Sequence, residues 1–141
     1  MLSNKDIVII GAGHSAGQAI ISLKQKKYLG KITVIGDEPW YPYQRPPLSK
    51  SFLSGDIDRE RLYVKPVQYF DDLNINFQFN THVERIIPEK NIVQTRDCDF
   101  SFDKLIISTG ARPRKLNING VSLKKIFYLR RINDAENIRS S

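Results

Sequence analysis

Apolar residues occur in this chain as short continuous runs and as stretches that repeat every three or four positions. Residues 7–10, 32–35 and 105–109 are largely continuous runs of branched side chains, which are typical of parallel strands buried on both faces. Residues 74–79 alternate polar and apolar positions and predict a fourth strand. We expect one parallel sheet in the order 75–79, 32–35, 7–10, 105–109, with the last strand at an edge.

The stretches between these strands carry helical patterns. An apolar stripe beside a row of lysines predicts a helix from His14 that ends at Gly30. Shorter helices are predicted at 66–73, where a proline lies in the first turn, and from Ile132 onward. The first strand, the first helix and the second strand therefore form a strand–helix–strand unit.

A second group of strands is predicted after the fourth parallel strand. Residues 83–87, 92–95 and 100–102 are short apolar segments separated by turn residues, and they predict an antiparallel meander. The expected fold class is α/β, with a Rossmann-like parallel sheet, helices and a small three-stranded antiparallel meander.

The first strand leads into a glycine turn, in which residues 11–16 match the pattern GxGxxA. Gly11 can adopt a sharp turn, Gly13 has no side chain to obstruct a pyrophosphate, and Ala16 is small enough for close packing of helix on strand. The helix that follows would direct its free backbone N–H groups and its positive dipole end toward a phosphate. The turn therefore predicts a dinucleotide site.

An acidic pair follows the second strand at the distance that such a site requires. Asp37 and Glu38 stand directly after residues 32–36, where a carboxylate can accept hydrogen bonds from a ribose. An ordinary tight turn at Gly11 and Gly13, and a solvated acid at Asp37, are the alternative interpretations. The complete strand–helix–strand context favours dinucleotide binding.

Residues 38–50 form a proline-rich loop that contains aromatic and basic side chains. The prolines exclude regular structure and stiffen the backbone. A short helix is expected after the loop, capped by Ser49 and ended by Gly55. Such a loop can simply cover one end of a sheet. Beside a dinucleotide site, its rigid aromatic and cationic groups would also suit a flat cofactor ring.

Composition narrows the class of protein. With 141 residues and 40% hydrophobic content, the chain predicts one globular domain with a sizeable core. It has no apolar run of about 20 residues, as a membrane span requires, and its start lacks the apolar core of a signal peptide, so we expect a cytoplasmic protein. Cys98 is the single cysteine and there are two scattered histidines, which predicts no disulfide and no metal site.

The net charge of +7, from 22 basic and 15 acidic residues, raises nucleic acid or an acidic partner as possibilities. The basic residues are mostly scattered, and the chain lacks an aromatic-rich RNA-binding signature. We therefore expect no nucleic-acid partner, and most of these charges are interpreted as solvated surface.

Residues 42–50, with the sequence PYQRPPLSK, follow a GAG strand–turn–helix, and together they resemble the putidaredoxin reductase type of ferredoxin reductase. The similarity covers the whole chain, because the segments 62–65, 104–114 and 128–130 also stand in the expected order. These proteins are flavoproteins that depend on FAD and NAD(P)H. The resemblance therefore implies the FAD/NAD(P)-binding fold, which we expect to be incomplete in this chain. Disulfide-reducing members of the larger glutathione reductase-like superfamily carry a cysteine pair after the second strand, which this chain lacks.

The resemblance implies the FAD-binding portion of an NAD(P)H-dependent oxidoreductase that passes electrons through FAD to a ferredoxin-type iron–sulfur protein. It places Gly11, Gly13 and Ser15 at the pyrophosphate, Asp37 at the adenosine ribose and Lys50 at the flavin end. Val83 and Arg130 also match positions that contact FAD in this family. Further candidates for cofactor contact are Ala12, His14, Glu38, Arg45, Pro46, Thr109 and Gly110. No catalytic nucleophile or base is expected, because the chemistry belongs to the cofactor.

The same resemblance predicts that residues 1–115 are the N-terminal part of the FAD-binding domain. Residues 116–141 would connect to an NAD(P)H-binding domain that this chain does not contain. The strand at 105–109 would then be an exposed edge through which the chain could self-associate, and the 141 residues alone would not be a competent enzyme. The alternatives left open are a stand-alone dinucleotide-binding module without turnover, or the FAD domain of a relative of NADH oxidase, nitrite reductase or monodehydroascorbate reductase.

Overall fold

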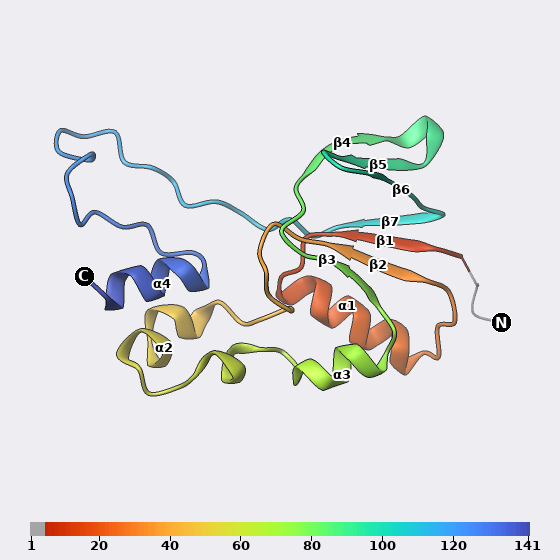
Figure 1. Ribbon diagram of the computed structural model, residues 1–141, viewed down its shortest axis with the longest axis horizontal. Coiled ribbons are helices and arrows are strands. Elements are labelled where there is room, and N and C mark those ends of the chain that lie inside the picture. Colours follow the sequence, from red (N-terminus) through yellow and green to blue (C-terminus); the bar gives the residue numbers. More distant parts are fainter. Residues whose placement is uncertain (1–4) are drawn as a thin grey trace. The chain divides into compact units, whose positions relative to one another are not determined.

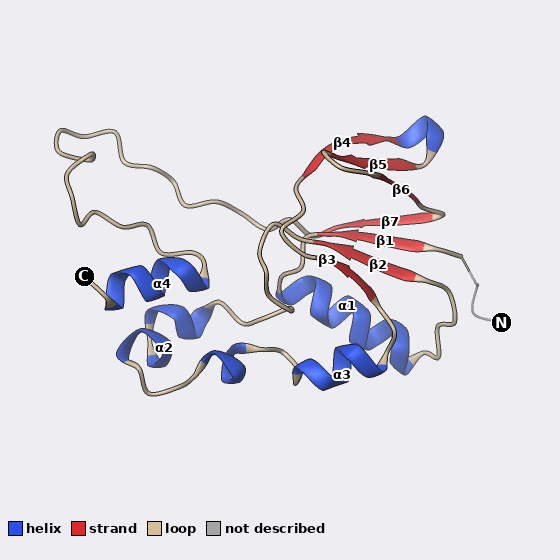
Figure 2. Cartoon of the chain, viewed as in Figure 1, coloured by secondary structure: helices blue, strands red, loops and turns tan. Residues whose placement is uncertain are grey.

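The computed structural model describes residues 5–141, and its elements follow the predicted order (Figures 1 and 2). The strands are β1 (Ile7–Ile10), β2 (Ile32–Ile35), β3 (Asn76–Gln78), β4 (Val83–Ile87), β5 (Ile92–Thr95), β6 (Asp99–Ser101) and β7 (Lys104–Ile107). The α-helices are α1 (His14–Gln25), α2 (Ser51–Ser54), α3 (Val67–Asp72) and α4 (Ile132–Arg139). Short 3₁₀ helices are η1 (Pro46–Ser49), η2 (Arg59–Leu62) and η3 (Pro88–Lys90).

The chain forms two compact units. The first unit contains the described residues up to Tyr43 together with Val64–Gly110, and the second contains Gln44–Tyr63 together with Ala111–Ser141. Each unit is thus built from two separate stretches of sequence. The domain boundary predicted at residue 115 remains a prediction.

The first unit contains both predicted sheets. The parallel sheet has the order β3-β2-β1-β7, as predicted. In the register, Ile7 of β1 lies between Ile32 of β2 and Lys104 of β7. The meander β4-β5-β6 is antiparallel, also as predicted. The predicted fold class is therefore confirmed.

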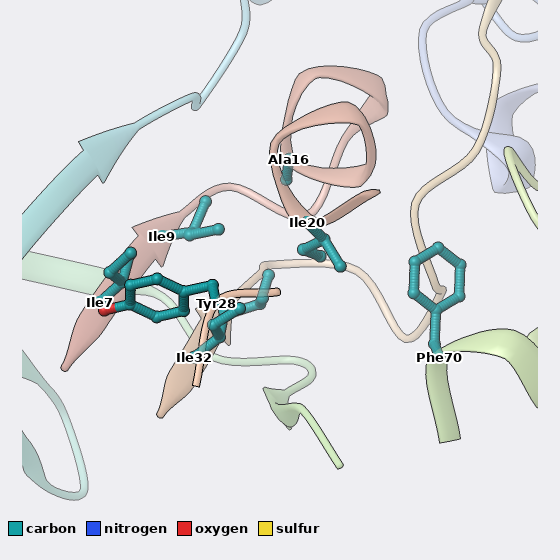
Figure 3. Close-up of a cluster of buried hydrophobic side chains, with 8 residues drawn as sticks. Ile7, Ile9, Ala16, Ile20, Tyr28, Ile32 and Phe70 are labelled. Carbon is teal, nitrogen blue, oxygen red and sulfur yellow. The ribbon is translucent and has the colours of Figure 1, made fainter. Parts of the chain in front are cut away.

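Two apolar clusters explain why β1 is a continuous apolar run. Figure 1 shows α1 and α3 on one side of the parallel sheet and the meander on the other. Ile7 and Ile9 pack with α1 and α3 in the first cluster, part of which is drawn in Figure 3. Val8 and Ile10 pack in a second cluster with Val93 of the meander. Each fully buried aliphatic side chain contributes about 1.5–3 kcal/mol, so both faces of β1 stabilise the unit.

The end of α1 differs from the prediction. The helix ends at Gln25, and Lys27 adopts a left-handed conformation with a φ of 55°. The backbone N–H groups of Lys27 and Tyr28 donate to the carbonyls of Lys24 and Leu23, at 2.9 and 3.0 Å, which is the Schellman pattern of helix termination. The predicted stop at Gly30 was wrong because Lys27, a non-glycine residue, adopts the left-handed turn.

The second unit is a small helical assembly in which α4 packs against α2 and η1. Its buried apolar side chains come from both sequence stretches: Leu48, Phe52, Leu62, Ile132 and Ala135. The helix α2 ends at Gly55, whose φ is 87°, as predicted. Ser49 is not its cap, because Ser49 lies within η1 and Lys50 is the residue before α2.

Candidate functional site

The glycine turn connects β1 to α1, and Gly11 is required there by the chain itself. Its φ is 98°, a conformation that L-residues with side chains rarely adopt. A Cβ at this position would lie 2.7 Å from the carbonyl carbon of Ser108. The N–H of Gly11 also donates to the carbonyl of Ile35 at 2.8 Å. Gly11 therefore makes the sharp turn that the sequence predicts.

Gly13 differs from Gly11 because no contact among the described residues requires a glycine there. Its backbone is extended, with a φ of −87° and a ψ of −167°. A Cβ added to it would meet no described atom within 4 Å. The space beside Gly13 is therefore open at the N-terminus of α1, where backbone N–H groups attract anions.

The first turn of α1 presents a polar surface beside this open space. His14 and Ser15 are exposed, and the turn contains no acidic side chain that would repel a phosphate. Ala16 is fully buried in the first apolar cluster. The small residue predicted for helix–strand packing therefore lies where the packing requires it.

The end of β2 approaches the glycine turn closely. A Cβ at Gly36 would lie 2.6 Å from the Cβ of Ala12, so this approach depends on a glycine after β2. Asp37 follows directly and comes from the strand adjacent to β1. The predicted phosphate turn and the predicted ribose acid therefore belong to neighbouring strand ends of one sheet.

The two acids after β2 have different surroundings. The Tyr43 hydroxyl donates to Oε2 of Glu38 at 2.7 Å, and Tyr43 is only 2% exposed. The Asp37 side chain is 41% exposed, and its Oδ1 lies 3.2 Å from Nδ1 of His82. Glu38 therefore anchors the start of the proline-rich loop, while Asp37 presents its carboxylate at the surface.

Three other candidates in the first unit stand at strand ends. Val83 begins β4 and packs against the second apolar cluster, so it has a core role as well as a candidate binding role. Thr109 and Gly110 follow β7 and are exposed, and Gly110 has a φ of 71°.

Ser108 was missed by the sequence analysis. Its Oγ donates to the Ile10 and Gly11 carbonyls at 3.1 and 3.2 Å. Its only signal was a polar residue near the end of an apolar run.

The second unit brings together two candidates that lie 85 residues apart in the sequence. Nη1 of Arg45 donates to the backbone carbonyl of Arg130 at 2.6 Å. The Nε atom of Arg130 is buried and has no hydrogen-bond partner among residues 5–141. Pro46 begins η1, and Lys50 is exposed before α2.

An ion pair that sequence analysis did not predict supports this arrangement. Nη2 of Arg59 lies 2.6 Å from Oε1 of Glu136 in α4. This hydrogen bond raises the pKa of Arg59 above its ordinary value, and burial raises the pKa of the neighbouring Tyr63. The pair joins the two stretches of the second unit. Neither residue stands in a recognisable motif, so the sequence alone offers no signal for it.

Within 5–141, no three His, Cys, Asp or Glu side chains are grouped so that they could hold a metal ion. The helices in the same range are too short or too polar to cross a membrane.

Comparison with known proteins assigns the family. The family model for pyridine nucleotide-disulphide oxidoreductases matches residues 5–141. The chain belongs to this family. The match covers all of the described residues, which include both the glycine turn and the proline-rich loop.

Curated family members show which branch is similar. Rhodocoxin reductase of Rhodococcus erythropolis is 45% identical over 136 residues, which are 96% of this chain and 32% of that protein. Rubredoxin-NAD(+) reductase of Pseudomonas putida is 37% identical over 134 residues, covering 94% of this chain and 35% of that protein. The chain therefore spans about a third of the length of these relatives.

Two solved structures of similar reductases have the same fold. The reductase in the covalent putidaredoxin reductase–putidaredoxin complex matches 98% of this chain and 34% of its own, with a TM-score of 0.90 and 32% identity. A ferredoxin reductase from Rhodopseudomonas palustris matches 97% of this chain and 34% of its own, with a TM-score of 0.89 and 36% identity. The predicted resemblance to putidaredoxin-type reductases is confirmed.

Proposed function

We propose that this chain is the FAD-binding portion of an NAD(P)H-dependent reductase that passes electrons to a ferredoxin-type iron–sulfur protein. The observation that carries the proposal is Gly13. No contact made by residues 5–141 requires a glycine there, and the space beside it is open at the N-terminus of α1. A bound pyrophosphate provides a reason for that open space. Two relatives, rhodocoxin reductase and rubredoxin-NAD(+) reductase, support the choice of reaction by their names.

The first unit supplies candidate residues for the pyrophosphate and the adenosine ribose of FAD. Gly11, Gly13 and Ser15 would hold the pyrophosphate, with Ala12 and His14 beside them. Asp37 would accept hydrogen bonds from the adenosine ribose. Val83 would be a further contact of the cofactor. In the second unit, Arg45, Pro46, Lys50 and Arg130 would serve the flavin end. The buried Nε of Arg130, without a hydrogen-bond partner in residues 5–141, supports a polar ligand at that residue.

A bound flavin would supply the redox chemistry, namely hydride acceptance and single-electron transfer. The residues of this chain would bind and orient. The α1 N-terminus would neutralise phosphate charge. Lys50 is exposed, and its ammonium group would place positive charge at the flavin end. We assign no general acid or base, and the acceptor and the choice between NADH and NADPH lie with the complete protein.

The proposal is tested on the full-length protein. Purification should yield a yellow protein with a flavin absorption spectrum, and heat release followed by chromatography should identify FAD. Anaerobic NADH or NADPH should bleach the spectrum, and a ferredoxin-type or rubredoxin-type protein should then be reduced. A colourless protein that binds ADP or NAD but takes up no FAD would overturn the proposal in favour of a binding module. Rapid oxidation by O₂ without reduction of an iron–sulfur protein would favour an oxidase.

Two further expectations belong to this proposal. The strand β7 is at the edge of the sheet, and Ile107 is 63% exposed. An exposed apolar edge strand can pair with another chain. The 141-residue chain should therefore self-associate in size-exclusion chromatography, and Ile107→Lys should reduce this self-association.

A cytoplasmic location is proposed as well, and cell fractionation tests it.

A further inference from the structure

A histidine that the binding motifs do not include contacts the proposed ribose acid. Nδ1 of His82 lies 3.2 Å from Oδ1 of Asp37, although the two residues are 45 positions apart. The His82 side chain is 63% exposed and the Asp37 side chain 41% exposed. The pair is therefore at the surface, where a ligand can reach the carboxylate.

The backbone holds this pair together. The N–H of Thr81 donates to the carbonyl of Gly36 at 2.9 Å, and the N–H of Gly36 donates to the carbonyl of Gln78 at 3.0 Å. The hydroxyl of Thr81 also donates to the carbonyl of Phe79 at 2.9 Å. The residues before β4 are thus hydrogen-bonded to the end of β2. These bonds place His82 beside Asp37.

The chemistry of the contact suggests a role. An imidazole whose Nδ1 carries a proton, in either the neutral or the charged form, donates to a carboxylate. A carboxylate has about four acceptor sites, so a bond from His82 to Oδ1 is compatible with hydrogen bonds from ribose hydroxyls. Holding the carboxylate in one orientation reduces the entropy lost when a ligand binds.

We propose that His82 is a positioning residue, which orients the Asp37 carboxylate for the ribose hydroxyls of an adenine nucleotide. This inference rests on the proposed function, because it assumes that Asp37 binds the adenosine ribose. The alternative is that the contact is an incidental meeting of two exposed side chains.

The test is calorimetric titration of the full-length protein, freed of flavin, with ADP and with 2′,3′-dideoxy-ADP. His82→Ala should bind ADP about three- to tenfold more weakly, the range for the loss of one hydrogen bond. His82→Asn, whose side-chain amide can also donate, should restore most of the affinity. Glu84→Ala, a change at an exposed residue of β4, is the matched control and should bind as the wild type does.

Two comparisons separate positioning from a general structural effect. The loss in His82→Ala should be absent with 2′,3′-dideoxy-ADP, which lacks the hydroxyls that Asp37 would bind. The double variant His82→Ala/Asp37→Ala should bind ADP no more weakly than Asp37→Ala alone. Equal losses for both nucleotides, additive losses in the double variant, or wild-type affinity in His82→Ala would each overturn the inference.

The same titrations distinguish this inference from the proposed function. If the wild-type protein binds neither ADP nor FAD, the proposed function fails and the role of His82 fails with it. If the wild type binds ADP, and Asp37→Ala weakens binding while His82→Ala does not, only the role of His82 is overturned.

Discussion

The two units place their candidate residues in different ways. In the first unit, residues 11–15 are positioned by consecutive elements, a strand, a turn and a helix. In the second unit, Arg45 meets Arg130 across 85 residues, and Arg59 meets Glu136 across 77 residues. A site built from neighbouring residues has a local sequence pattern. A site assembled from distant stretches has none, and it depends on contacts that form only when the chain has folded.

The two glycines of the turn also differ in what requires them. Gly11 serves the fold, because its conformation and its contact with Ser108 exclude a side chain. Gly13 has no such constraint. A local motif can therefore combine one residue that the structure needs with one that only a ligand explains.

The largest expected effect comes from breaking these two glycines separately. Gly11→Val should lower the free energy of unfolding by about 2–6 kcal/mol, because it combines a strained backbone with a steric clash. Gly13→Val should leave the unfolding transition nearly unchanged and abolish FAD binding, because its side chain would fill the open space. Denaturant unfolding and FAD titration measure both variants. Normal FAD binding by Gly13→Val would contradict the pyrophosphate assignment.

The next largest effect is the difference in dinucleotide affinity between variants of the two acids after β2. Asp37→Ala should weaken adenine dinucleotide binding about tenfold or more, since hydrogen bonds to a charged group contribute about 1.5–3 kcal/mol. Glu38→Ala should act mainly through the lost bond from Tyr43, so Tyr43→Phe should reproduce its effect. Fluorescence titration checks these affinities. Unchanged binding in Asp37→Ala together with weakened binding in Glu38→Ala would move the ribose role to Glu38.

A third prediction concerns the exposed lysine of the second unit. If Lys50 places its charge near the flavin, Lys50→Met should lower the two-electron potential by on the order of 30 mV, equivalent to about 1.4 kcal/mol. Reduction by NAD(P)H should become slower, while FAD affinity should change little. Potentiometry and stopped-flow absorbance measure this, with the exposed Lys90→Met as the control. An unchanged potential would leave Lys50 as a surface lysine.

The smallest effect concerns the ion pair that links the two stretches of the second unit. Both side chains are 37% exposed, so a double-mutant cycle with Arg59→Met and Glu136→Gln should give a coupling of about 0.2–1 kcal/mol. Hydrogen exchange should show faster opening of α4 in both single variants. A coupling near zero would mean that the buried apolar side chains alone hold the second unit together.

Much of the first unit was predictable because its determinants are local. The positions of the strands, the meander and the turn at Gly11 follow from short apolar runs, turn residues and one glycine pattern. The end of α1 was not predictable in the same way. Lys27 adopts the left-handed turn, and the glycine predicted to end the helix lies three residues further on.

The sequence by its own pattern specified a parallel α/β fold, a phosphate-binding turn and an acid after the second strand, because each is encoded within a few neighbouring residues. Folding decided which acid stays at the surface, since Tyr43 binds Glu38 and His82 contacts Asp37. It also decided that Arg45 meets Arg130. Such pairings depend on the distances between strand ends and helices, which are set by packing of the whole chain and leave no trace in residue spacing.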